Sequence, residues 1–139
     1  MDEFLIVRIG PADADRLVDV AAGVFNDPID AALLAAYLAD PGTVLVVACE
    51  NGRVIGQAMG ALHRHPDKPS DLYVDEVAVS PDHRRRGIAR ALLAELEACA
   101  RELGCADIWL ATERGNDGAR AWYGSFAEAK DCVLYFWDL

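Results

Sequence analysis

The stretch Val77-Ala-Val-Ser-Pro-Asp-His-Arg-Arg-Arg-Gly-Ile-Ala89 is the part of the sequence that decides the fold. It predicts an apolar strand, a turn with three consecutive arginines, and a glycine followed by the first residues of a helix. Backbone N–H groups gathered at such a helix N-terminus bind phosphate groups. Two carboxylates, Asp75 and Glu76, stand directly upstream in the same apolar strand. The combination predicts an enzyme that binds a phosphorylated carrier and removes a proton beside it.

The composition predicts one folded domain over residues 1–139, because 53% of the residues are hydrophobic and the length suits one buried core. No apolar run approaches the length that crosses a bilayer, so no membrane association is expected. The first residues are acidic and then strand-like, unlike a signal peptide, which predicts a cytoplasmic location.

The sequence has four cysteines without metal-site spacing, which predict free thiols: Cys49, Cys99, Cys105 and Cys132. His63 and His65 are explained by a surface loop, and no metal site is expected.

The charge is distributed unevenly. The formal net charge is −10, which argues against nucleic acid as a partner. Residues 1–83 carry 14 acidic and 5 basic side chains, whereas residues 84–139 carry 9 acidic and 8 basic ones. The first half therefore suits a cationic ligand, and the arginine turn suits an anion. The alternative for the acidic excess is that surface carboxylates keep the protein soluble.

Apolar periodicity and turn residues predict the order of elements. Strands are expected over residues 4–9, 43–48, 54–62, 71–79, 108–111 and 132–137, and helices over residues 13–24, 31–39, 88–103 and 117–123. Asp30 and Asp117 are expected to cap helices, and Gly104 to end the long one. Asn51-Gly52 predicts a hairpin turn, and Gly56 and Gly60 predict bulges. The order describes an α/β domain with a mixed sheet.

This order, centred on Arg84-Arg85-Arg86-Gly87-Ile88-Ala89, resembles the GNAT superfamily of acetyl-coenzyme A-dependent N-acetyltransferases. The phosphate motif of that family, Gln/Arg-x-x-Gly-x-Gly/Ala, is matched by Arg84, Gly87 and Ala89. A Val-x-Val-x-Pro strand precedes it, and Asn116 and Trp122-Tyr123 follow at suitable places, so the resemblance covers nearly the whole chain. It implies a mixed, mostly antiparallel central sheet with helices on both faces, with acetyl-CoA as co-substrate and no metal.

Within the superfamily, the chain is similar to small aminoglycoside 3-N-acetyltransferases. The similarity rests on Leu72-Tyr-Val-Asp-Glu-Val-Ala-Val-Ser-Pro-Asp-His-Arg-Arg-Arg-Gly-Ile-Ala-Arg-Ala-Leu-Leu93, on Glu113-Arg-Gly-Asn-Asp117 and on Val133-Leu-Tyr-Phe136. It implies acetylation of a polycationic small molecule and a role in antibiotic resistance. The alternatives are a polyamine, an amino acid or a protein N-terminus as acceptor, or a non-catalytic acyl-CoA-binding module.

The chemistry assigns two catalytic roles. Glu76 is the candidate general base, acting directly or through one water. Placing a carboxylate in an apolar strand costs free energy unless it has a partner, which disfavours a chance placement. The similar enzymes carry an aspartate at this place. The motif places Tyr123 to protonate the departing thiolate, and a tyrosine ring packed in the core is the alternative.

The remaining contacts follow from the turn and the resemblance. The expected acetyl-CoA contacts are Val77, Ala78, Val79, Arg84, Arg85, Arg86, Gly87, Ile88, Ala89, Asn116, Ala119 and Tyr123, and the expected acceptor contacts are Asp75, Glu76, Asp117 and Tyr135. Further alternatives remain open: each arginine side chain can face solvent, Asn116 can cap a helix, Asp75 can pair with an arginine, and Asp117 can be a solvated carboxylate. In a regular strand, Asp75 points to the face opposite Glu76. The resemblance and the apolar C-terminal run also suggest a homodimer, with burial of that run inside the monomer as the alternative.

Overall fold

The computed structural model describes residues 3–139. In this part of the chain five strands form one sheet in the order β1-β2-β3-β4-β5. Their bounds are Leu5–Arg8, Thr43–Glu50, Arg53–His63, Asp71–Val79 and Asp107–Trp109. Neighbouring strands are antiparallel, except β4 and β5, which are parallel. The predicted mixed, mostly antiparallel sheet is confirmed.

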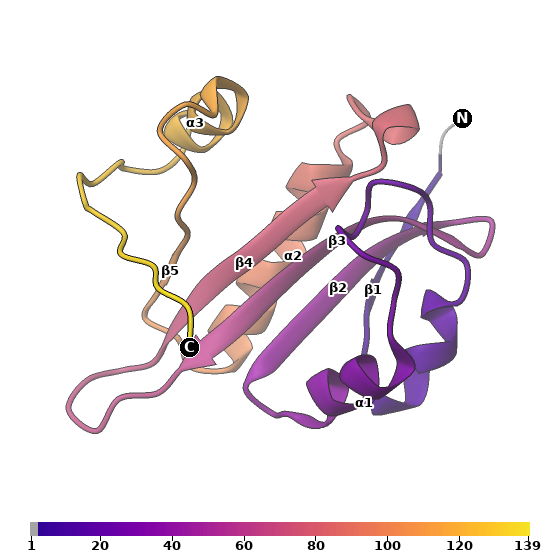
Figure 1. Ribbon diagram of the computed structural model, residues 1–139, viewed down its shortest axis with the longest axis horizontal. Helices are drawn as coiled ribbons and strands as arrows, with labels where there is room; N and C mark the ends of the chain where they lie inside the picture. Colours follow the sequence, from indigo (N-terminus) through magenta and orange to yellow (C-terminus); the bar gives the residue numbers. More distant parts are fainter. Residues whose placement is uncertain (1–2) are drawn as a thin grey trace.

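Helices cover both faces of this sheet (Figure 1). Helix α2 (Ile88–Glu102) packs across β2, β3 and β4 on one face, while α1 (Ala31–Ala39) and the 3₁₀ helix η1 (Pro11–Leu17) lie on the other. The predicted apolar stripe of α2 is buried, with Leu92 and Leu96 fully inaccessible to solvent. The predicted ends are also correct, since Asp30 Oδ1 accepts a 2.9 Å hydrogen bond from Leu33 N at α1 and Gly104 takes a φ of +79° after α2.

The predicted helix over residues 13–24 is wrong beyond its first turns. Its apolar positions Leu17, Ala21 and Val24 are buried as expected. However, the backbone after η1 bonds to the edge of β3 instead of to itself, because Ala21 N donates to Val54 O at 2.8 Å and Val54 N donates to Asp19 O at 2.9 Å. The apolar spacing therefore reflects contact with the sheet, which a sequence pattern cannot distinguish from a helix.

The predicted closing strand over residues 132–137 is also wrong. After β5 the chain leaves the sheet, forms α3 (Asp117–Gly124) and ends in an irregular segment (Figure 1). Its five consecutive apolar residues, Val133 to Trp137, are 74–82% exposed, since no strand of the described chain pairs with them. No helix within residues 3–139 is long and apolar enough to cross a membrane.

Candidate active site

A bulge in β4 determines how the two carboxylates are presented. Met59 of β3 pairs with Glu76, but the next residue, Gly60, pairs with Val74, so Asp75 is an extra residue in β4. A second register shift lies beside Gly56, between β2 and β3. Both glycines therefore lie beside a bulge, as predicted.

The bulge brings Asp75 and Glu76 to the same face of the sheet. A side chain added at Gly56 would touch Leu92 of α2, so by alternation Met59 and its partner Glu76 face away from α2. Val74 pairs with Gly60 and faces α2, which turns Asp75 away from α2 as well. The expectation that Asp75 and Glu76 point to opposite faces is therefore wrong, because it assumed a regular strand.

Glu76 is held by a buried amide that the sequence reasoning missed. Gln57 of β3 has no solvent exposure, and its Nε2 donates to Glu76 Oε1 at 2.7 Å and to the carbonyl of Val24 at 3.1 Å. Glu76 itself is half-buried. The single polar residue inside the apolar run Val54 to Leu62 was the signal that could have identified Gln57.

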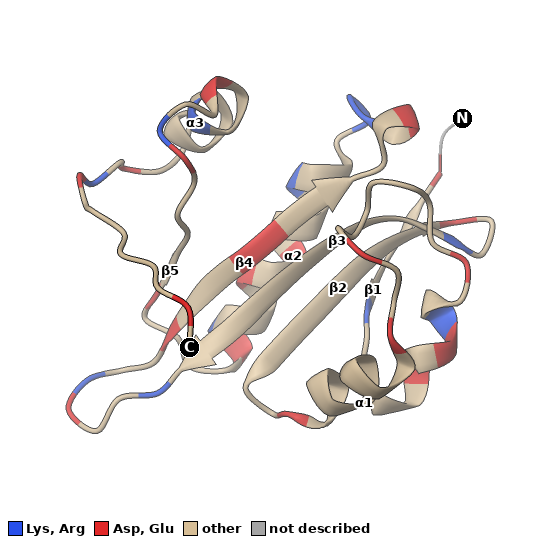
Figure 2. Ribbon diagram, viewed as in Figure 1, with Lys and Arg blue, Asp and Glu red and all other residues tan. Residues whose placement is uncertain are grey.

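The Asp75 side chain is exposed to solvent, but neighbouring groups change the pKa of its carboxyl. Partial burial raises the pKa of the Asp75 carboxyl, and the nearby His63 opposes this by lowering it. On α1, burial raises the pKa of Tyr37 far above its ordinary value, and the negative charge of Asp75 adds to this increase. Asp75 and Glu76 therefore lie on the α1 side of the sheet and give it a negative charge at the middle of β4 (Figure 2).

Two histidines and an indole surround the carboxylate at the start of β4. Asp71 lies 3.2 Å from His63 Nδ1 and 2.6 Å from His65 Nε2, and it accepts a 2.9 Å hydrogen bond from Trp109 Nε1. The bonds from His65 and Trp109 lower the pKa of Asp71. Tyr73 packs against Trp109 with ring centroids 4.5 Å apart. Among residues 3–139, no group of three His, Cys, Asp or Glu side chains is arranged to hold a metal ion.

The arginine turn has the backbone geometry of an anion cradle. Arg85 and Gly87 both adopt left-handed conformations, with φ values of +63° and +77°. Gly87 is the N-cap of α2 without a side-chain cap, and the N–H groups of the first helical turn lack intrahelical partners. A side chain added at Gly87 would meet nothing within 4 Å, so a ligand can approach the backbone there.

The three arginines of the turn differ in what their side chains do. Those of Arg84 and Arg85 are exposed and give this end of the molecule its positive charge (Figure 2). Arg86 instead donates two hydrogen bonds to Glu50, at 3.0 and 3.3 Å, and these lower the pKa of the Glu50 carboxyl. His83 Nε2 lies 3.4 Å from the same carboxylate. Glu50, which the sequence reasoning also missed, thus fixes both ends of the turn to β2.

The edge of β4 beside the turn is open. Strand β5 pairs only with Asp71, Leu72 and Tyr73, so within the described chain the edge from Val74 to Val79 has no strand beside it. Because Ser80 N donates to Ile55 O of β3 at 2.8 Å, the alternation of the strand turns the backbone groups of Ala78 toward β3 and those of Val77 and Val79 toward the open edge. The side chain of Ile88, another predicted contact, is buried in the core.

Helix α3 carries the other predicted contacts. Asn116, and not Asp117, caps this helix, because its Oδ1 accepts a 3.1 Å hydrogen bond from Ala119 N. The ring of Tyr123 lies 4.8 Å from that of Trp122, and both pack against the buried core. Burial raises the pKa of Tyr123. Tyr135 is 81% exposed in the irregular C-terminal segment, where no hydrogen bond or ring contact joins it to a described residue.

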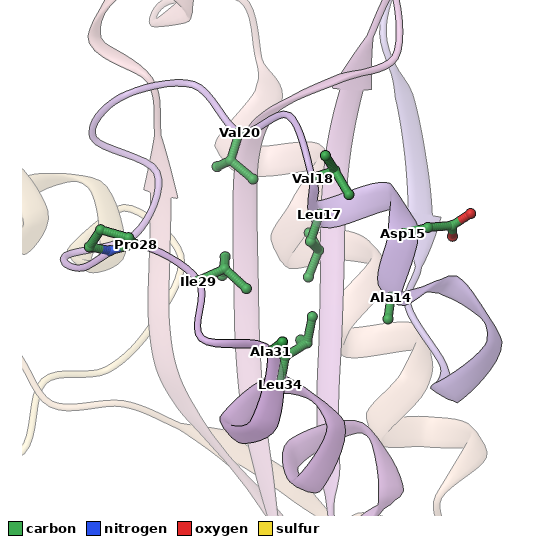
Figure 3. Close-up of a pocket in the computed structure, with 9 residues that line it drawn as sticks. All are labelled: Ala14, Asp15, Leu17, Val18, Val20, Pro28, Ile29, Ala31 and Leu34. Atoms are coloured by element: carbon green, nitrogen blue, oxygen red, sulfur yellow. The ribbon is translucent and has the colours of Figure 1, made fainter.

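An apolar hollow of about 640 Å³ lies between η1 and α1 (Figure 3). Its lining includes Leu17, Ile29 and Leu34, whereas Asp15 points away from the others in the close-up. None of the predicted site residues lines this hollow. It is therefore separate from the cradle and from the β4 carboxylates.

Comparison with known proteins agrees with this arrangement. Residues 15–127 match the Acetyltransferase (GNAT) family. The chain is 35% identical over 117 residues to the N-alpha-acetyltransferase RimI of Mycobacterium tuberculosis, covering 82% of this chain and 71% of that protein.

Two solved structures share the fold. An aminoglycoside acetyltransferase, HMB0005, from an uncultured soil metagenomic sample superposes with a TM-score of 0.84 at 19% identity, over 99% of each chain. AAC(6')-Iy, solved with a CoA-containing bisubstrate analog, superposes with a TM-score of 0.80 at 19% identity, over 99% of this chain and 100% of that chain. At these identities the likeness shows the fold alone. From the family match, the cradle and the β4 carboxylates, we conclude that this chain is an N-acetyltransferase of the GNAT family.

Proposed function

We propose that this N-acetyltransferase transfers the acetyl group of acetyl-CoA to an amine of a polycationic small molecule, namely the 3-N position of an aminoglycoside. The observation that carries this proposal is the β4 bulge, which presents Asp75 and Glu76 together beside the open edge of the strand. Adjacent carboxylates attract a ligand with several ammonium groups. Structural neighbours named as aminoglycoside acetyltransferases support the same class of acceptor. Such an activity inactivates the antibiotic and gives resistance.

The residues at the turn fit acetyl-CoA. The left-handed Arg85 and Gly87 and the free amides at the start of α2 suit a pyrophosphate, and Arg84 and Arg85 add positive charge. The side chain of Arg86 orders the turn through Glu50, and only its backbone is assigned to the ligand. The backbone groups of Val77 and Val79 on the open edge suit the amide-containing pantetheine arm, and Ala78 lies between them. The NH₂ group of Asn116 is assigned to the same arm, next to Ala119, since its oxygen caps α3.

The reaction needs two protons removed from the substrate ammonium and one supplied to the leaving thiolate. Glu76 accepts one proton of the substrate ammonium, directly or through one water, and the freed amine attacks the thioester carbon in a ternary complex. As the C–N bond forms and the C–S bond breaks, Tyr123 donates its proton to the departing thiolate sulfur, and the proton that the acylated nitrogen loses passes through solvent to the Tyr123 phenolate. Burial raises the pKa of Tyr123 and keeps this phenol protonated at neutral pH. Asp75, with Asp117 and Tyr135, is assigned to the other groups of the acceptor.

A second candidate acceptor is a protein N-terminus, which the similarity to the N-alpha-acetyltransferase RimI favours. A single α-amine needs fewer carboxylates around it than a polycation does. The negative face formed by Asp75 and Glu76 therefore favours the aminoglycoside. Polyamines and amino acids are further candidate acceptors. The alternative to an enzyme is a module that binds acyl-CoA without catalysis.

The test is thiol release from acetyl-CoA by the purified protein with aminoglycosides, polyamines, amino acids and peptides as acceptors, and the acetylated position is identified by NMR. We expect turnover with aminoglycosides and a product acetylated at 3-N. We expect Glu76→Gln to lower kcat by about 10²- to 10⁴-fold with acetyl-CoA binding retained. The matched control is Glu97→Gln, which changes a partly exposed carboxylate on α2 that pairs with Arg101. Turnover of peptides alone would replace the aminoglycoside, and acetyl-CoA binding without any turnover would exclude the enzyme.

We further propose that residues 1–139 act as one catalytic domain in the cytoplasm and assemble as a homodimer. The apolar residues Val133 to Trp137, each more than 70% exposed in one protomer, support the dimer because a second copy can bury them. Light scattering should give twice the mass of one chain, and Phe136→Asp should give a monomer. A wild-type protein that is monomeric at micromolar concentration would refute the dimer.

A further inference from the structure

Gln57 is an isolated polar side chain inside the apolar strand β3. It is completely buried, and burying an amide costs free energy unless its hydrogen bonds are made. The neighbours on either side of it, Gly56 and Ala58, are small and serve packing against α2. The position therefore needs an explanation other than the filling of the core.

The geometry connects Gln57 to the catalytic carboxylate. Gln57 pairs with Ala78, two residues beyond Glu76, so the two side chains are diagonal neighbours on the same face of the sheet. The NH₂ group has two hydrogens and makes two hydrogen bonds, one to Glu76 Oε1 at 2.7 Å and one to the carbonyl of Val24 at 3.1 Å. Exchanging the amide nitrogen and oxygen would place an oxygen against the carboxylate, so the orientation is fixed.

Burial of the Gln57 side-chain amide has a free-energy cost that a packing role does not explain. Its carbonyl oxygen, Oε1, is buried and has no hydrogen-bond partner among the described residues. An apolar side chain of equal length would avoid this cost but would leave Glu76 without its donor. We propose that Gln57 is a positioning residue for acetyl transfer, which fixes the Glu76 carboxylate in place. This inference rests on the proposed role of Glu76 as general base.

Other charges near Glu76 do not duplicate this donor. The ionisable groups on the same face are Asp71, Tyr73 and Asp75 of β4, His63 of β3 and Tyr37 of α1. No ion pair within residues 3–139 includes Glu76. Within residues 3–139, the hydrogen bond from Gln57 is therefore the side-chain contact that holds the Glu76 carboxylate in place.

The test compares Gln57→Met with Met59→Leu, a control on the same strand and face that removes no hydrogen bond. A hydrogen bond to a charged group is worth about 10- to 100-fold in an equilibrium, so Gln57→Met should lower kcat by roughly that factor. The KM for acetyl-CoA should not change. A wild-type kcat in folded Gln57→Met would overturn the inference.

Two further variants keep the inference testable. Gln57→Glu is close in shape and serves if Gln57→Met does not fold, and it should lower kcat as well because a carboxylate cannot donate a hydrogen bond to Glu76. In the Glu76→Gln background the effect of Gln57→Met on kcat should disappear, whereas a structural role would add to that of Glu76→Gln. Normal activity of Glu76→Gln alone would refute the general base, while loss of activity there with a wild-type kcat in Gln57→Met would refute only the role of Gln57.

Discussion

Gly56 lies where the sheet supports the start of α2, and Gly56→Ala tests whether this packing sets the acetyl-CoA cradle. A Cβ at this position would lie 3.1 Å from Leu92 Cδ1, 3.2 Å from Ile88 Cγ2 and 3.2 Å from the carbonyl oxygen of Ala78. These distances are shorter than ordinary van der Waals contacts, so Ile88 and Leu92 of α2 must shift by a few tenths of an ångström. Ile88 belongs to that turn and follows the left-handed Gly87 directly.

The magnitude follows from two opposing effects. Overpacking a well-packed core costs about 1–3 kcal/mol. Replacing a strand glycine by alanine returns about 0.5–1 kcal/mol, because the unfolded chain loses less freedom on folding. We expect a net destabilisation of about 1–2 kcal/mol, and a fall of roughly 5 °C in Tm for a domain of this size. Because α2 shifts at its N-terminus, the Kd for coenzyme A should rise as well.

The assays are urea unfolding and calorimetric titration with coenzyme A. The control is Gly115→Ala, where an added Cβ meets nothing within 4 Å and the backbone is not left-handed. Unchanged stability of Gly56→Ala would show that the packing at this site is looser than the distances indicate. A loss of stability with unchanged coenzyme A affinity would refute the link between this contact and the cradle.

Three further changes test separate parts of the structure. Asp30→Ala removes the N-cap of α1 and should lower the free energy of unfolding by about 1 kcal/mol in urea titrations, with Asp30→Ser restoring most of it and the KM for acetyl-CoA unchanged. Glu50→Gln removes the charge that holds Arg86 and should raise that KM several-fold in steady-state kinetics, whereas an unchanged KM would mean that the turn is ordered without it. The lowered pKa of Asp71 contributes stability above its ordinary pKa of 3.8, and this is lost as the pH falls through the lowered value, so wild type and His65→Gln should differ in unfolding free energy at about pH 5 and converge toward about pH 3. A constant difference over that range would contradict the contribution of this contact.

Several features were predictable because they depend on neighbours in the sequence. The stripe of apolar residues at steps of three and four determined α2, and Gly104 ended it. The turn with Gly87 was recognisable because glycine adopts a left-handed φ at little cost and the N–H groups at a helix N-terminus bind phosphate. Asp30 was recognisable as the cap of α1 because its side chain bonds to the backbone only three residues further along the chain.

The wrong predictions lie where contacts between distant segments determine the backbone conformation. Residues 18–24 have helical spacing but bond to the backbone of β3, and the apolar C-terminal run reads as a strand but has none beside it within the described chain. A sequence pattern reports which side chains are apolar. It does not report which backbone they meet.

The sequence by itself determined the chemistry: a basic turn before a helix, a pair of carboxylates in the strand before it, and the GNAT order of elements. The tertiary structure decided which groups act together. Only the register of β3 against β4 turns Asp75 and Glu76 to one face, sets Gln57 against Glu76, and leaves the strand edge open beside the turn. Glu50 and Arg86 likewise meet across 36 residues of chain. Such pairings depend on hydrogen-bond register and packing, which no local spacing encodes.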